Sequence, residues 1–290
     1  MLSSFSSSFS FGKMTKVFPS PFQNAVLVLD LDGENYSGFG SEWTDASRYK
    51  NDAFATNHVP RHTANSQFYF TLEGSLILEE FVPPDDEEAA DGGGGFIGGD
   101  PVPANTAVSN TVIDNSERFV VQDKASLDIE TEITFEMWYR LGSLQGADPT
   151  VLFSKISEVE ANTYIGYYGY VNSSGYTFSF GNSANNQVLE YSTTPAVDTW
   201  QHIAVSISNS GSSIYINGVE AANLIYTTTS TASNDADLLV GSAVYGTIGA
   251  SITDMYSFDG DIAAFRIYDG TLTAAEVLSN FNEKKSRFGL

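Results

Sequence analysis

Hydrophobic and polar residues alternate with a period of two along much of this chain. In residues 203–208, Ile203, Val205 and Ile207 alternate with alanine and serine. Residues two apart lie on the same face of a β-strand. The pattern therefore predicts a strand whose Ile and Val side chains face a hydrophobic core.

Short segments with the same alternation occur throughout the chain. The first strand is expected from Val26, and others at residues 119–121, 133–139, 151–153, 164–168, 176–180 and 188–191. Glycine, asparagine and serine lie between these segments, as in the turns of antiparallel sheets. We therefore predict an all-β fold, a two-sheet antiparallel β-sandwich.

Two local signals refine this prediction. Asn217-Gly218 lies between Ile214-Tyr215-Ile216 and Val219, and Asn-Gly readily adopts the positive φ angles of a two-residue hairpin turn. Thr273 and Glu276 have the spacing of a capping box, with Leu272 and Val277 as a hydrophobic staple. One short C-terminal helix is therefore expected, with an apolar stripe of Val277, Leu278 and Phe281.

Several motifs occur in a characteristic order. They are Trp200-x-His202-x-Ala204, Tyr215-x-Asn217-Gly218, Phe258-x-Gly260-x-Ile262, Arg266-x-Tyr268 and Leu272-Thr273-x-x-Glu276. Together they resemble the laminin-G-like, concanavalin A-like jelly rolls over residues 119–283. Where such domains usually have Phe-Asp-Gly, this chain has Leu72-Glu73-Gly74, so a role for that aspartate is not carried over.

The N-terminal half has a second resemblance. Residues 27–32, 38–47 and 51–53, and the leader at residues 5–13, are similar to such domains in bacteriophage virion structural proteins. This resemblance implies a protein on a virion surface, such as a capsid decoration, head fibre or tail-associated protein. It also implies other virion proteins as partners, and by analogy a homo-oligomer.

We expect two parts in the chain. Residues 1–18 are rich in serine and phenylalanine and are predicted to be a docking tail, and residues 19–290 one jelly-roll domain. An acidic Gly/Pro-rich loop is expected at about residues 83–107. The predicted docking residues are Phe5, Phe9, Phe11 and Phe96.

Charge and composition exclude several classes of partner. The chain has 36 acidic and 13 basic residues, a net charge of −23, which disfavours nucleic acid. It has no cysteine, so neither disulfides nor cysteine metal sites are expected. No apolar run is long enough to span a membrane, and no secretory signal is recognisable. A place outside the cell is therefore expected through release in a particle.

Catalytic patterns are weak, and we predict no enzyme activity and no catalytic residue. Asp128, Glu130 and Glu132 alternate on one expected strand face, but hydrolases of this fold read Glu-x-Asp-x-Glu, and Ser126 stands where the nucleophile would be. His58 and His62 flank Pro60, which argues against a metal pair on a helix. His202 is expected to be packed or hydrogen-bonded.

Calcium is the one cofactor to consider, because many relatives hold it at the sandwich rim. Residues 30–34 fail as an EF-hand, since the twelfth position is Ser41 rather than glutamate. Turns that satisfy their own backbone would explain the rim aspartates equally well. The candidate ligands are Asp235, Asp237, Asp254, Asp259 and Asp261.

Aromatic residues suggest a second function. Tyr167, Tyr168, Tyr170 and Tyr176 could form a platform for sugars, or serve only as strand residues with a wet tip. The leading hypothesis is thus a non-enzymatic virion-surface protein that touches the host surface. The alternative is a calcium-assisted glycan-binding adhesion module, and a concanavalin A-like glycoside hydrolase comes third.

Overall fold

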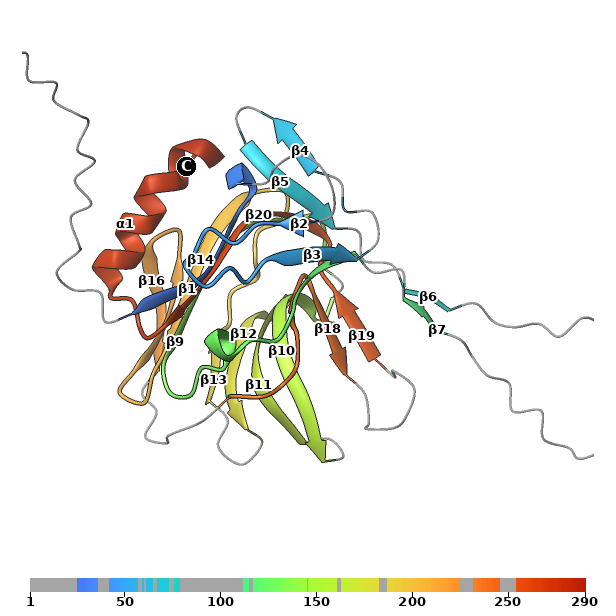
Figure 1. Ribbon diagram of the computed structural model, residues 1–290. Helices are drawn as coiled ribbons and strands as arrows, with labels where there is room; N and C mark the ends of the chain where they lie inside the picture. Colours follow the sequence, from blue (N-terminus) through green and yellow to red (C-terminus); the bar gives the residue numbers. More distant parts are fainter. Residues whose placement is uncertain are drawn as a thin grey trace, which may run out of the picture.

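The alternating segments form two antiparallel sheets that pack face to face in the computed structural model (Figure 1). The structure describes residues 25–35, 42–56, 59, 61–64, 67–72, 76–78, 112–114, 117–144, 146–160, 163–182, 187–224, 232–245 and 254–290. The tail and Phe5, Phe9, Phe11 and Phe96 lie outside these residues, as does the predicted loop at 83–107.

The first sheet has eight strands. In spatial order they are β16 (Val219–Leu224), β15 (Ser212–Ile216), β14 (Trp200–Ile207), β9 (Ile133–Leu141), β20 (Gly260–Asp269), β5 (Gln67–Leu72) and β4 (Arg61–Ala64), with β1 (Val26–Asp32) also paired to β20. The predicted hairpin joins β15 to β16, with Asn217 at φ 52° and Gly218 at φ 77°. The positive φ angles confirm the Asn-Gly turn.

The second sheet also has eight strands. Their order is β13 (Gln187–Tyr191), β12 (Gly175–Asn182), β11 (Thr163–Asn172), β10 (Thr150–Glu160), β17 (Leu238–Val240), β8 (Arg118–Val121), β3 (Ala53–Thr56) and β2 (Glu42–Trp43). Two further pairs form separate two-stranded sheets, β6 (Leu76–Leu78) with β7 (Val112–Asp114) and β18 (Ser242–Tyr245) with β19 (Asp254–Ser257).

The helical segments are few. Three 3₁₀ turns, η1 (Gly33–Asn35), η2 (Ala125–Leu127) and η3 (Lys285–Phe288), accompany a single described α-helix, α1 (Ala274–Lys284). Thr273 and Glu276 form the predicted capping box. No helix in the described part of the chain is long and apolar enough to cross a membrane.

Aromatic rings fill the space between the sheets. Phe135 of β9 lies 4.4 Å from Phe153 of β10, ring centre to ring centre, and Phe153 lies 5.1 Å from Phe265 of β20. At the other end, Trp43 of β2 lies 4.7 Å from Phe70 of β5. Burying such rings away from water is the main favourable term in forming the sandwich.

The outer face of the first sheet is covered as well. Ala204, predicted to face away from the core, is buried with Val277 of α1, and Trp138 of β9 stacks on Phe288 at 4.2 Å. Figure 1 shows α1 lying beside β1, β14 and β16. Val277 and Phe281 of the predicted apolar stripe are buried, whereas Leu278 is exposed. The helix therefore covers part of this face.

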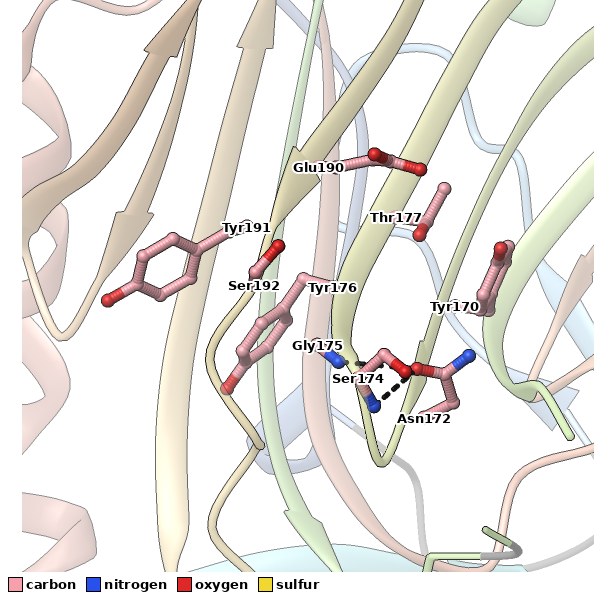
Figure 2. Close-up of a pocket in the computed structure, with 9 residues that line it drawn as sticks. All are labelled: Tyr170, Asn172, Ser174, Gly175, Tyr176, Thr177, Glu190, Tyr191 and Ser192. Atoms are coloured by element: carbon pink, nitrogen blue, oxygen red, sulfur yellow. Dashed lines mark hydrogen bonds between the residues drawn. The ribbon is translucent and has the colours of Figure 1, made fainter. Parts of the chain in front are cut away.

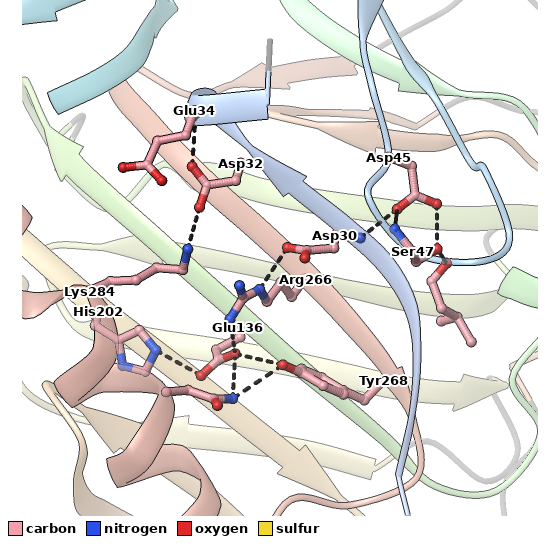
Figure 3. Close-up of polar contacts among 12 residues, drawn as sticks. Asp30, Asp32, Glu34, Asp45, Ser47, Glu136, His202, Arg266, Tyr268 and Lys284 are labelled. Atoms are coloured by element: carbon pink, nitrogen blue, oxygen red, sulfur yellow. Dashed lines mark hydrogen bonds and ion pairs between the residues drawn. The ribbon is translucent and has the colours of Figure 1, made fainter. Parts of the chain in front are cut away.

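A polar network lies beneath the helix (Figure 3). Glu136, fully buried, accepts hydrogen bonds from Tyr268 Oη at 3.2 Å and Asn280 Nδ2 at 3.0 Å, and lies 3.1 Å from His202 Nε2. This confirms the hydrogen-bonded role expected for His202. Arg266 pairs with Asp30 at 2.7 Å in the same network.

Asp32 ties the end of β1 to the C-terminal segment. Its carboxylate accepts from Lys284 Nζ and, at 2.7 Å, from Arg287. Burial alone would raise its pKa, but the backbone N–H of Glu34 and the Lys284 ammonium outweigh burial and lower the pKa below its ordinary value. Burial likewise opposes a lowering of the pKa of Glu136, which His202 and Arg266 produce.

The loop between β2 and β3 is held by hydrogen bonds within the loop and to β1. Asp45 accepts from the backbone N–H groups of Asp30 at 2.8 Å, Ser47 at 2.7 Å and Asn51 at 2.7 Å, and Asn51 Nδ2 donates to the carbonyl of Val28 at 2.7 Å. These hydrogen bonds fix the loop against β1.

Lys155 of β10 holds the rim of the second sheet. Its ammonium is fully buried and contacts Asp123 Oδ1 at 2.7 Å, Asp128 Oδ1 at 3.3 Å and the carbonyls of Asn234 and Ala236 at 2.6 and 2.8 Å. A buried charge needs such partners to offset its lost hydration. The side chain thereby joins β10 to the segments before β9 and β17.

Acid should weaken the fold through Asp32 and Glu136. A carboxyl whose pKa is lowered by folding stabilises the protein above its unfolded-state pKa, and that stability is lost as pH falls through the folded-state pKa. We expect the free energy of unfolding in urea to stay level from pH 7 to about pH 5 and to fall below about pH 4. Asp32→Asn should reduce the fall, whereas exposed Asp269→Asn should leave it unchanged. An equal fall in all three proteins would contradict this.

Removing the Lys155 ammonium should destabilise the fold. Lys155→Met leaves Asp123 and Asp128 without their cation, which should cost about 3 kcal/mol in urea unfolding at pH 7. Lys124→Met removes an exposed lysine from the same region and serves as the matched control. A loss no larger than that of the control would show that the buried ion pairs do not hold the rim.

Candidate functional site

The outer face of β11, β12 and β13 differs from the rest of this acidic chain. These three strands contain one charged residue, Glu190 of β13. Tyrosine, threonine, serine and asparagine make up most of the outward positions. An uncharged aromatic and polar face is the kind of surface that can contact a neutral polar ligand without desolvating many charges.

Strand register decides which of the four predicted tyrosines face outward. Tyr167 and Tyr176 point into the sandwich and are buried at 0% and 3% exposure. Tyr168 and Tyr170 are half-buried on the other face, and their rings stack with centres 6.2 Å apart and planes 8° apart. Burial raises the pKa of the Tyr168 hydroxyl. Of the four tyrosines, Tyr168 and Tyr170 therefore lie on the outer face, where a sugar platform would have to form, and Tyr167 and Tyr176 belong to the core.

A row of three residues crosses the strands beside Tyr168. Tyr170 of β11 pairs with Thr177 of β12, and Thr177 pairs with Glu190 of β13. Directly paired positions lie side by side on one face of a sheet. Figure 2 shows the ring, the hydroxyl and the carboxylate of this row. Among the described residues, the Glu190 carboxylate has no hydrogen-bond partner, so it is available to a ligand.

A pocket of about 160 Å³ opens at the end of this row, where β11 turns into β12. The residues that line it are Tyr170, Asn172, Ser174, Gly175, Tyr176, Thr177, Glu190, Tyr191 and Ser192. Asn172 Oδ1 accepts from the backbone N–H groups of Ser174 at 2.9 Å and Gly175 at 3.2 Å. The asparagine therefore fixes the turn (Figure 2).

Glycine is required at position 175. Its φ is 144°, and a Cβ atom there would lie 2.1 Å from the carbonyl oxygen of Tyr191. Behind it, the hydroxyl of Tyr176 lies 3.2 Å from Gln201 Oε1 and 3.3 Å from the hydroxyl of Tyr139. The pocket is thus anchored to the first sheet by polar contacts.

The predicted calcium ligands do not converge in the described residues. Asp235 is exposed, Asp237 accepts from the backbone N–H of Asp123 at 2.8 Å, and Asp261 pairs with Arg140 at 2.5 Å. Asp259 accepts from the hydroxyl of Ser143. The described residues contain no group of three or more His, Asp or Glu side chains that could hold a metal.

Other sequence candidates also differ from expectation. The strand predicted for Asp128, Glu130 and Glu132 is wrong: the segment after η2 has no strand, and β9 begins at Ile133. Asp128 turns to Lys155, and Glu130 is exposed. Lys155 fixes this segment, which the sequence pattern could not show.

Three further candidates lie partly or wholly outside the described residues. Asp254 begins β19 and His62 lies in β4, but their side chains are outside the described part of the structure. His58 is outside it altogether.

Sequence reasoning missed Glu190 and Asn172. A signal was present, because residues 163–191 contain a single charged side chain in a chain with 36 acidic and 13 basic residues. The row of Tyr170, Thr177 and Glu190 depends on register, which residue spacing alone does not give.

Solved structures with the same fold include binding domains. Domain 4 of the extracellular arabinanase AbnA from Geobacillus stearothermophilus, solved with arabinotriose, matches 88% of this chain over 98% of its own length, with 14% identity and a TM-score of 0.54. The binding domain of Paraclostridial Mosquitocidal Protein 1 matches 89% of this chain, with 13% identity and a TM-score of 0.57.

A botulinum neurotoxin type C structure, described as dependent on two ganglioside molecules for cell entry, also matches 89% of this chain, with 15% identity and a TM-score of 0.58. This chain spans about half the length of the two toxin chains, 52% and 51%. At these identities the likeness shows the fold alone. No curated protein sequence matches the chain.

A family model gives the stronger result. The model of the concanavalin A-like lectin/glucanases superfamily matches residues 114–278, more than half of the 290 residues. The match includes β11, β12 and β13 and the hairpin at Asn217-Gly218. This chain belongs to the concanavalin A-like lectin/glucanase superfamily.

Proposed function

We propose that this protein is a carbohydrate-binding adhesion module whose ligand lies on the outer face of β11, β12 and β13. The observation that carries the proposal is the pair of stacked, half-buried rings of Tyr168 and Tyr170 on a face with one charge. The C–H face of a sugar ring packs on a flat aromatic ring, and the tyrosine hydroxyl remains free for a polar contact.

The row of Tyr170, Thr177 and Glu190 supplies the polar part of the site. Neighbouring strands lie about 4.8 Å apart, so the row extends roughly 10 Å, which suits an oligosaccharide laid across the strands. The Thr177 hydroxyl and Glu190 carboxylate accept hydrogen bonds from sugar hydroxyls. The pocket at the β11–β12 turn holds the end of the chain of sugars.

The similar structures support a binding role. The arabinanase domain was solved with arabinotriose and the type C neurotoxin is described with gangliosides, so this fold presents carbohydrate sites in other proteins. A shared fold does not fix function. The proposal that this chain also binds carbohydrate therefore rests on its own outward tyrosines, Tyr168 and Tyr170.

The proposed activity is binding of the sugar without cleavage. Glycoside hydrolysis usually needs two carboxyl groups about 5 to 9 Å apart, and Glu190 is the one carboxylate that lines the pocket. Calcium assistance, predicted from the rim aspartates, stays a prediction. Adding a chelator to a binding assay tests it, since lost binding would support calcium and retained binding would contradict it.

The place of action is a separate proposal. The leader at residues 5–13 supports display on a phage-like virion, with Phe5, Phe9, Phe11 and Phe96 docking on other virion proteins and the jelly roll facing the host. A homo-oligomer would add multivalency, which strengthens weak sugar contacts.

Replacing the outward ring should abolish most glycan binding. Tyr170→Ala should weaken binding on a glycan array about tenfold, or ~1.4 kcal/mol, with an unchanged circular dichroism spectrum. Tyr170→Phe keeps the ring and should retain most of the binding. Full binding by the alanine variant would place the sugar elsewhere, and a folded wild-type protein that binds no glycan would contradict the proposal.

Deleting residues 1–18 tests the virion proposal independently. The truncated protein should keep the β circular dichroism spectrum but fail to join particles in a lysate, because the docking phenylalanines Phe5, Phe9 and Phe11 are gone. Incorporation at the wild-type level would remove the tail from the proposal.

A further inference from the structure

The charges around the pocket carry an inference about which sugars it takes. Of the nine residues that line the pocket, Glu190 is the one that is charged at neutral pH, and none is lysine, arginine or histidine. The three strands beneath contain no basic residue. A carboxylated ligand would therefore meet a carboxylate without a cation to pair with.

β10, the strand next to β11, has one basic residue, and this residue and Arg140 of the other sheet are both paired with carboxylates. Lys155 of β10 points into the sandwich, where it is fully buried against Asp123 and Asp128. Arg140 of β9 pairs with Asp261. Neither can turn to the outer face of β11 without breaking an ion pair, and for Lys155 the broken pair is buried.

The turn beside the pocket adds to the negative charge. Asn172 Nδ2 donates to the carbonyl of Ala147 at 3.1 Å, and the backbone N–H of Ser173 donates to Gly146 at 2.8 Å. These bonds bring the loop containing exposed Asp148 to the rim. Together with the turn bonds they use Oδ1 and one of the two Nδ2 hydrogens of Asn172, so the side-chain donors left to a ligand are hydroxyl groups and the second Nδ2 hydrogen.

We propose that this pocket prefers uncharged and amino sugars to carboxylated sugars such as sialic acid. This inference rests on the proposed function and names its ligand class. An ammonium group on a sugar pairs with Glu190, whereas a sugar carboxylate is repelled. The net charge of −23 acts in the same sense at long range. Exposed ion pairs are weak, so the selectivity is modest and is screened by salt.

Two matched pairs of glycans on one array provide the test. The wild type should bind a glucosamine trimer about three- to fivefold more tightly than the N-acetylglucosamine trimer, the range of an exposed ion pair. It should bind lactose more tightly than sialyllactose by a similar factor. Glu190→Gln keeps an oxygen acceptor but removes the charge nearest the ligand, so both ratios should fall toward one.

Glu130→Gln is the matched control, because Glu130 is exposed and lies outside the three strands. It should leave both ratios unchanged. Sialyllactose bound as tightly as lactose, or ratios that Glu190→Gln does not alter, would overturn the selectivity while leaving carbohydrate binding in place. A folded wild-type protein that binds no glycan on the array would overturn the proposed function together with the selectivity.

Discussion

The packing of aromatic rings between the two sheets is the constraint on which the rest of the structure depends. Phe153 contacts Phe135 and Phe265 across the interface, and Trp43 contacts Phe70 at the other end. Because both inner faces are buried in this core, a ligand has access to the outer faces and to the turns at the rim of the sandwich. Since α1 and η3 cover part of one outer face through Trp138, the exposed face of β11 to β13 is the better candidate.

The distribution of charge follows the same division. Basic residues that face the interior or the helix are paired with carboxylates: Arg266 with Asp30, Lys284 with Asp32, and Lys155 with Asp123. These pairs hold helix, first strand and rim to the sandwich. These basic side chains thus stabilise the fold. The three strands of the candidate site contain a single charged residue. The face of these strands is therefore mostly uncharged, apart from Glu190.

Local signals in the sequence predicted local structure well. The Asn217-Gly218 turn, the capping box at Thr273 and the core position of Val205 could be read from short motifs. The burial of Ala204 could not, because it depends on α1, which folds back from far along the chain. The strand expected around Glu130 failed for a related reason, since that segment is fixed by Lys155 across the rim.

The candidate site also depends on contacts between distant segments, which short sequence motifs do not show. Sequence alone identified a cluster of tyrosines but not which of them face outward, because Tyr167 and Tyr168 are adjacent and point to opposite faces. Glu190 joins Tyr170 only through the register of three strands. Tertiary pairing, not residue type, assembles the site.

The most direct test of the account is a crystal structure of the full chain with the neutral oligosaccharide that binds most tightly on the array. The account predicts a sugar ring packed on Tyr170, with a hydroxyl bonded to Glu190. A sugar bound on the covered face beside α1, or in loops away from β11 to β13, would contradict it.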